Sequence, residues 1–242
     1  MVSMLSRLAA VLFLAAPLHG CLAYEYEHEF WLRTDGSGSV FVTGRPALWV
    51  AFKGLGRVDD PEGTATREAA RAFFEKAGLR VNRVTLTRRR GQRYLFVSAD
   101  FDDVNKLSAS GAFPDLDIAL RREGQRLRLA GAWRPPPGSP PLPAGHREGL
   151  LAVRFHLPSK VYLHDNAADG VERGNIVSWR QEVAEAQAGR PVAFGGLMDD
   201  RSILFSTVIL FGSAIGLALL ILISVFAVIT HRGRKQAGAH PP

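Results

Sequence analysis

The feature that most constrains this chain is an apolar run near its C-terminus. Residues 203–230 form a stretch of 28 residues without a charged side chain. A helix that crosses a bilayer needs about 20 consecutive apolar residues, so this run is long enough to span the membrane with some tilt. A buried core helix of that length would seldom lack a charge altogether. The sequence therefore predicts a transmembrane helix over 203–230, followed by a short tail over 231–242.

Charges on the two sides of this run predict its orientation. The tail begins with His231, Arg232, Gly233, Arg234 and Lys235, whereas an acidic pair, Asp199 and Asp200, precedes the run with Arg201. Basic residues stay on the cytoplasmic side of a spanning helix. We therefore expect a single-pass protein of the bacterial cytoplasmic (inner) membrane, with a basic cytoplasmic tail and an extracytoplasmic N-terminal domain.

Two small residues inside the run, Gly212 and Gly216, stand one helical turn apart. This spacing lets two helix backbones approach closely and predicts a homodimer through the transmembrane helix. The other interpretation is that glycine is simply frequent in spanning helices.

The N-terminus has the layout of a secretory signal. One positive charge at Arg7 precedes the apolar stretch 8–18, which is too short to span a membrane. Leu18, Gly20 and Cys21 resemble a bacterial lipobox, although His19 occupies a position where a small residue is usual. We therefore expect a signal peptide over 1–20 and a lipid thioether on Cys21; plain cleavage and an uncleaved anchor are the alternatives. Because Cys21 is the only cysteine, an internal disulfide and a Cys-rich metal site are excluded.

The charge balance argues against nucleic acid as a partner. The chain has 30 basic and 23 acidic residues, and four of the basic residues lie outside 22–202, which leaves 26 against 23. Such a small excess on a domain next to a membrane suits anionic lipid headgroups at least as well.

The pattern of residues over 21–200 predicts an exported α+β domain. Apolar and polar residues alternate over 24–33, which predicts a half-buried strand, and turn residues 35–38 lead into a return strand over 39–43. Residues 64–78 have helical spacing, with Thr64 or Thr66 as the expected cap, and hairpin patterns follow. We expect one twisted antiparallel sheet with one or two helices packed on it. The Pro-rich residues 134–144 predict an extended insertion at one edge of that sheet.

Two of the predicted hairpins share an Arg-rich turn, RRGQR at 89–93 and RREGQR at 121–126. Such loops can meet phosphate headgroups or an acidic partner, or they can be ordinary solvated turns.

No catalytic constellation is present in the sequence. The exported histidines, His28, His146, His156 and His164, belong to no spaced catalytic or metal-binding motif, and the Gly-rich stretches lack the context of a nucleotide-binding loop. We therefore expect no enzyme activity, no cofactor and no metal.

With the lipobox Cys21, the turn at 35–40 (DGSGSV) and the late strand at 174–179 (GNIVSW) in view, the chain resembles the bacterial LppM-like lipoprotein domain, a membrane-anchored envelope lipoprotein. The basic tail after the spanning helix fits the same layout, and the proline insertion departs from it. The resemblance implies a role in the cell envelope and the handling of lipids or lipoglycans. It carries no catalytic residues.

Two functions follow from these observations. In the first, the exported domain binds a lipid or lipoglycan in an apolar pocket lined by Phe73, Phe74, Trp31 or Trp133. In the second, the protein is an accessory or scaffold subunit of an envelope membrane complex and acts through protein–protein contacts, with a filled core.

Overall fold

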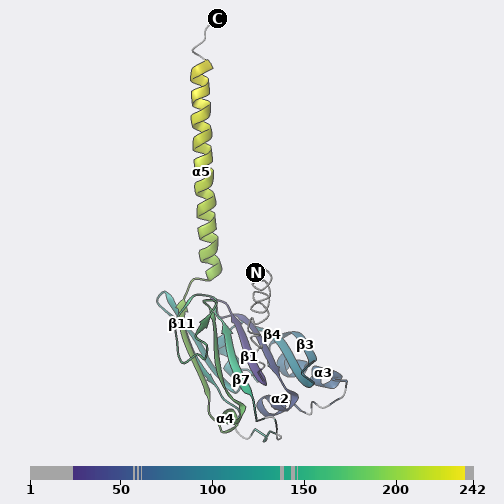
Figure 1. Cartoon of the computed structure of the whole chain (residues 1–242). Coiled ribbons are helices and arrows are strands. Elements are labelled where there is room, and N and C mark those ends of the chain that lie inside the picture. Colours follow the sequence, from purple (N-terminus) through teal and green to yellow (C-terminus); the bar gives the residue numbers. More distant parts are fainter. Residues whose placement is uncertain are drawn as a thin grey trace, which may run out of the picture.

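The protein consists of a folded domain from which one long helix projects (Figure 1). The computed structural model describes residues 24–237, apart from 57, 59, 61, 137, 138, 143, 144 and 146; for Ser206 and 231–237 it describes the backbone alone. Cys21 and the predicted signal peptide lie outside the described residues, as does His146.

The domain contains two β-sheets. The larger sheet has seven strands, which in spatial order are β3 (Arg80–Arg89), β4 (Gln92–Phe101), β2 (Gly38–Gly44), β1 (Tyr26–Leu32), β7 (Leu150–His156), β10 (Ile176–Glu182) and β9 (Val171–Glu172). The smaller sheet has four strands, in the order β5 (Leu116–Glu123), β6 (Arg126–Trp133), β11 (Val192–Asp199) and β8 (Val161–His164).

The expected α+β class is confirmed, but the strands divide between two sheets instead of forming one. The predicted hairpins are present and antiparallel; among the described strands, β1 and β7 alone pair in parallel, with Phe30 opposite Phe155. In the chain, the Pro-rich segment lies between β6 of the small sheet and β7 of the large sheet, and β7 begins at the end of the large sheet where β1 begins. The proline segment is thus the connection between the sheets, and its Leu142 is buried.

Four helical elements accompany the sheets: α2 (Pro46–Lys53), α3 (Thr64–Lys76), the 3-10 helix η1 (Val104–Ala109) and α4 (Val183–Gln187). The predicted helix is α3, which ends beside Gly78 at a positive φ of 82°. Its expected threonine cap is not used. Instead, the Asp60 carboxylate accepts the backbone N–H groups of Ala65 and Thr66. Helix α2 was not expected from the sequence because its residues are apolar on nearly all sides.

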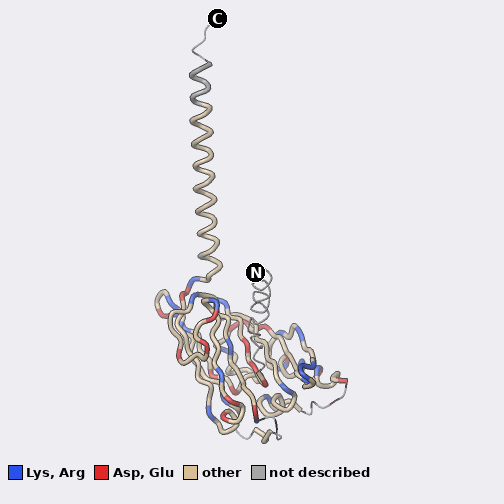
Figure 2. The backbone as a smooth tube through the Cα atoms, viewed as in Figure 1, with Lys and Arg blue, Asp and Glu red and all other residues tan. Residues whose placement is uncertain are grey.

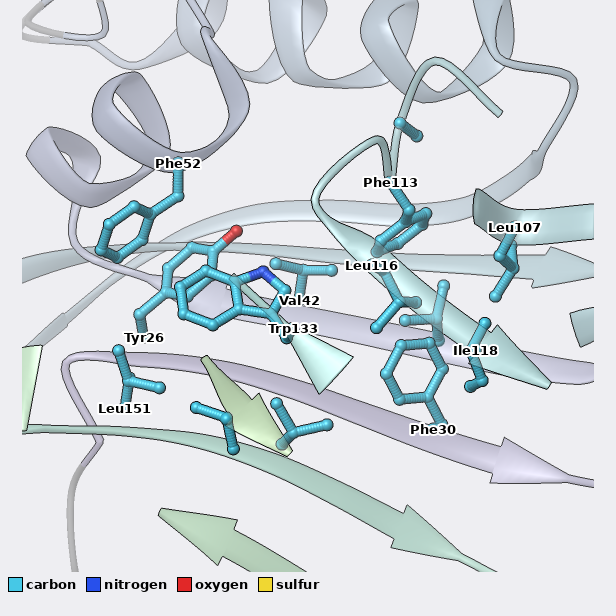
Figure 3. Close-up of a cluster of buried hydrophobic side chains, with 14 of the residues drawn as sticks. Tyr26, Phe30, Val42, Phe52, Leu107, Phe113, Leu116, Ile118, Trp133 and Leu151 are labelled. Atoms are coloured by element: carbon cyan, nitrogen blue, oxygen red, sulfur yellow. The ribbon is translucent and has the colours of Figure 1, made fainter. Parts of the chain in front are cut away.

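The core lies on the inner face of the large sheet. The small sheet covers β1, β7 and β10, where the rings of Phe155 and Phe194 are 5.0 Å apart. Helices α2 and α3 cover the rest, where Trp49 on α2 meets Phe74 on α3. In the close-up, Tyr26, Phe52 and Trp133 lie together where a strand of each sheet meets α2 (Figure 3).

Helix α5 (Ile203–Ala237) contains the apolar run and is the one candidate membrane span among the described residues. The 28 residues of the run rise about 42 Å, against about 30 Å of hydrocarbon, so the helix can cross with tilt. The hydroxyl groups of four of its residues donate to carbonyls within the helix: Thr207 to Ile203, Ser213 to Ile209, Ser224 to Leu220 and Thr230 to Ala227. This is what an apolar solvent requires of polar side chains.

Candidate functional site

The two ends of the domain differ in their relation to α5. Strands β1 and β7 both end next to α5, since β7 leads into Pro158, whose carbonyl accepts the N–H of Ile203 at 3.1 Å. We call this the α5 end and the opposite one the far end. Tyr26 lies at the far end, where it pairs with Gly44.

A surface pocket of about 290 Å³ opens on the large sheet at the α5 end. It forms where β1 and β7 end and β2 and β10 begin. The residues that line it are Trp31, Leu32, Arg33, Ser39, Phe41, His156, Leu157 and Asn175. The pocket is therefore one residue away from the segment that contacts α5, because Leu157 precedes Pro158.

Aromatic rings form the floor of the site. The Trp31 indole is 49% exposed and stacks on the His156 imidazole, with ring centres 4.0 Å apart and planes 12° from parallel. Phe41 meets Trp31 edge-on at 6.3 Å and stacks on Phe96 at 6.0 Å. These four rings cross β7, β1, β2 and β4 in a row on the outer face. Such a row is a flat apolar surface for stacking or for alkyl chains.

Three glutamates, Glu29 and Glu27 of β1 and Glu25 just before it, continue this face away from the pocket, and each pairs with a basic side chain. Glu29 bonds His156 at 2.6 Å, Glu27 lies 3.6 Å from Arg154, and Glu25 bonds Arg45 at 2.9 Å. They are half-buried rather than fully solvated. The described residues contain no group of His, Cys, Asp or Glu side chains suited to a metal ion.

Burial and neighbouring charge affect the two inner glutamates in opposite ways. Burial raises the pKa of Glu27, and Arg154 offsets this only in part. Burial also raises the pKa of Glu29, but the hydrogen bond and charge of His156, together with the Arg154 charge and a hydrogen bond with Trp31, outweigh it and hold that pKa below its ordinary value. Glu29 is thus an ionised partner that fixes the His156 ring under Trp31.

A second polar cluster is sealed in the core. The Lys53 ammonium lies 2.9 Å from the Asp115 carboxylate with both side chains 0% exposed, and it also donates to the carbonyl of Ala112 at 2.9 Å. The indole N–H of Trp133 donates to the same carboxylate. Burial and the Lys53 charge lower the pKa of the neighbouring His28 well below its ordinary value. This cluster joins α2 to β6 and to the loop before β5, and its side chains are fully buried.

The structure does not bring the four predicted pocket residues together. Trp31 lines the pocket, but Phe74 and Trp133 are 0% exposed in the core, and Phe73 is partly buried on α3 against Phe74. Sequence reasoning missed His156, Phe41 and Asn175. Asn175 belongs to the GNIVSW motif singled out in the sequence, and its side-chain amide donates to the carbonyl of Leu157 at 2.8 Å.

The two Arg-rich turns lie at opposite ends of the domain. The turn at 121–126 is at the α5 end, because Arg126 pairs with Asp199 and Gln125 accepts the N–H of Asp200. The turn at 89–93 is at the far end, because β4 begins there. The two turns therefore cannot act on one ligand.

The fold and site thus define an α+β domain with a surface pocket beside a candidate membrane helix. A search of solved structures found similarity to the folded domain of LppM from Mycobacterium tuberculosis, determined by NMR, with 16% sequence identity and a TM-score of 0.36. The match covers 72% of this chain and 88% of that one. No family model and no curated protein matches the sequence.

Proposed function

We propose that this chain is a membrane-anchored bacterial envelope protein whose exported domain binds a lipid or lipoglycan at the pocket of Trp31 and His156. The observation that carries the proposal is the position of the pocket. Leu157 lines it and the next residue bonds the start of α5, so an amphiphile in the bilayer lies within reach of it. The exposed indole offers apolar contact and Arg33 a charge for a headgroup.

The proposed role is binding rather than catalysis. His28 is buried beneath Tyr26 and Lys53, His156 is held between Trp31 and Glu29, and His164 accepts the N–H of Ala167 in a turn. These contacts give each described histidine a structural role.

Native mass spectrometry of the full chain, released from detergent micelles, tests the binding site. We expect one bound lipid per chain that is lost in Trp31→Ala and kept in Phe96→Ala. Phe96 is the matched control because it belongs to the same aromatic row but does not line the pocket. Equal lipid occupancy in the wild-type chain and in Trp31→Ala would refute the site.

Tryptophan fluorescence gives an independent readout. Of the four tryptophans, Trp49, Trp133 and Trp179 are at most 2% exposed, so a brominated amphiphile in the pocket quenches Trp31 selectively. We expect Arg33→Gln to weaken binding of a phosphate-headed amphiphile roughly tenfold, and the far-end variant Arg88→Gln to leave it unchanged.

Lipidation of Cys21 is part of the proposal and has a geometric consequence. Two residues separate Cys21 from Tyr24, so Cys21 can lie at most about 11 Å from the far end of the domain, where β1 begins. The seven residues of β1 extend about 20 Å from there to the α5 end. A lipid on Cys21 and α5 in one membrane would therefore lay the domain along the bilayer. A diacylglycerol mass on the N-terminal peptide, absent in Cys21→Ala, supports the anchor; an unmodified Cys21 refutes it.

We further propose that α5 crosses the inner membrane with its C-terminus in the cytoplasm, as the flanking charges favour, and that it pairs with a second copy through Gly212 and Gly216. A side chain added at either glycine would meet open space in the single chain. Gly216→Leu should therefore weaken self-association in membranes without loss of the fold, and unchanged energy transfer between labelled copies would contradict the dimer.

The alternative role, an accessory or scaffold subunit, is favoured by one observation. Phe74 and Trp133 fill the core instead of lining a cavity. Affinity capture of the full chain with and without α5, followed by identification of partners retained only with α5, tests this role.

A further inference from the structure

We propose that the domain has a second membrane-binding surface, a collar of residues 121–126, 160–163 and 199–201 that docks on anionic headgroups around α5. This inference rests on α5 crossing the membrane, but it is independent of the pocket at Trp31.

The collar is fastened to the start of α5. The N–H of Ile203 donates to Pro158, and the hydroxyl of Ser159 donates to the carbonyl of Arg201 at 2.8 Å. The N–H of Asp200 donates to Gln125 at 3.2 Å. Because Asp200 and Arg201 directly precede the helix and Gln125 bonds Asp200, the collar lies beside the start of α5.

The charge of the collar fits an anionic surface. It contains five basic residues, Arg121, Arg122, Arg126, Lys160 and Arg201, and three acidic ones, Glu123, Asp199 and Asp200. Each of the three carboxylates already has a partner within the protein: Glu123 pairs with Arg128, Asp200 with Arg122, and Asp199 accepts the Tyr162 hydroxyl. The exposed side chains of Arg121, Arg126, Lys160 and Arg201 add four positive charges, against the one charge of Asp199, whose partner is a neutral hydroxyl. Figure 2 shows basic residues, with acidic ones between them, at this end of the domain below α5.

The collar also exposes apolar surface. Outside α5, the large hydrophobic side chains exposed among the described residues are Trp31, Tyr162 and Leu163, and the last two belong to the collar, 45% and 62% exposed. Arg126 and Lys160 lie over the Tyr162 ring, 5.2 and 5.8 Å from its centre. Tyrosine flanked by basic residues is typical of the membrane interface, where an apolar ring and a polar tip are both accommodated.

The far-end turn supplies a natural control. It has a similar sequence and the exposed side chains of Arg88, Arg89 and Arg90, but it lies at the opposite end of the sheet from α5. If the collar acts through its position, removing three positive charges from the collar should weaken docking on anionic headgroups, and removing three from the far-end turn should leave docking unchanged.

The experiment uses the full chain, with Cys21→Ser and Gln125→Cys, labelled at residue 125 with an environment-sensitive fluorophore. Gln125 is exposed at the tip of the collar hairpin and its contact with Asp200 uses the backbone alone. The chain is placed in nanodiscs of phosphatidylcholine, with or without phosphatidylglycerol. We expect blue-shifted, stronger emission in the anionic discs, and loss of this shift at high salt.

Each basic residue near an anionic surface biases docking about fivefold, so the triple variant Arg121→Gln, Arg126→Gln, Lys160→Gln should reduce the ratio of docked to undocked domain roughly 100-fold. The variant Arg88→Gln, Arg89→Gln, Arg90→Gln should keep the shift. Equal emission in both kinds of disc, or equal loss in both triple variants, overturns the collar. A chain that is not retained in discs at all overturns the membrane span and the collar together.

Discussion

The buried pair of Lys53 and Asp115 links α2 to the loop before β5. We consider Lys53→Met, which keeps an unbranched side chain one atom shorter and removes its charge. The Asp115 carboxylate then stays buried with the Trp133 indole N–H as its remaining described donor, and the carbonyl of Ala112 loses a donor.

The expected loss follows from complete burial. Both side chains are 0% exposed, so water cannot replace the missing partner. Removing one member of a buried pair costs about 3–5 kcal/mol, a large part of the 5–15 kcal/mol that stabilises a typical domain. The double variant Lys53→Met, Asp115→Leu removes the uncompensated charge and leaves the Trp133 N–H without its acceptor, at a cost of about 1–3 kcal/mol. It should therefore be more stable than Lys53→Met alone.

Pulse proteolysis of the full chain in nanodiscs over a urea series measures these differences. With a slope of about 2 kcal/mol per molar urea, Lys53→Met should lower the unfolding midpoint by roughly 2 M. The matched control is Glu75→Gln in the exposed pair of Arg71 and Glu75 on α3, which should change stability by less than about 0.5 kcal/mol. A loss below about 1 kcal/mol in Lys53→Met, or a double variant as unstable as the sum of the single ones, would refute the reasoning.

Two further predictions concern the core. Burial holds His28 neutral in the folded state, so below pH of about 6.5 the unfolded chain gains a proton that the folded chain does not, and stability should fall by up to about 1.4 kcal/mol per pH unit. His28→Gln should remove this contribution between about pH 6.5 and 5, and an unchanged pH slope would contradict a neutral buried ring. At Gly131, an added Cβ would lie 2.1 Å from the carbonyl oxygen of Asp117 on the paired strand and 2.8 Å from the Phe194 ring. Gly131→Ala should therefore destabilise the domain by about 1–3 kcal/mol in the same urea assay. Gly111→Ala, where the added Cβ meets open space, is the control, and equal losses in the two variants would refute a steric cause.

Local patterns predicted most of the elements and one residue of the pocket, Trp31, but not the rest of the site. The alternation over 24–33 gave β1, and the apolar spacing over 64–78 gave α3. Helix α2 was not predicted because its eight mostly apolar residues show no amphipathic period. The other pocket residues were not predicted because they come from strands that are adjacent only in the folded sheet. Trp31 pairs with Ser39 on one side and with His156 on the other.

The exposure of individual aromatic residues was likewise decided by the fold. Trp31 and Trp133 both occur in strand patterns, yet one is 49% exposed and the other 0%. Trp31 faces outward on the large sheet, whereas Trp133 lies between the small sheet and α2 with Asp115 as its acceptor.

The sequence by itself determined the period of each strand, the hairpin turns and the long apolar helix, because these depend on residues a few positions apart. Only the tertiary structure decided that the Pro-rich segment carries the chain from one sheet to the other and that β1 and β7 run parallel. It also decided that one Arg-rich turn reaches α5 while the other lies at the far end. Pairing between strands more than 100 residues apart depends on how whole faces of the sheets pack, and the local order of side chains does not determine that packing.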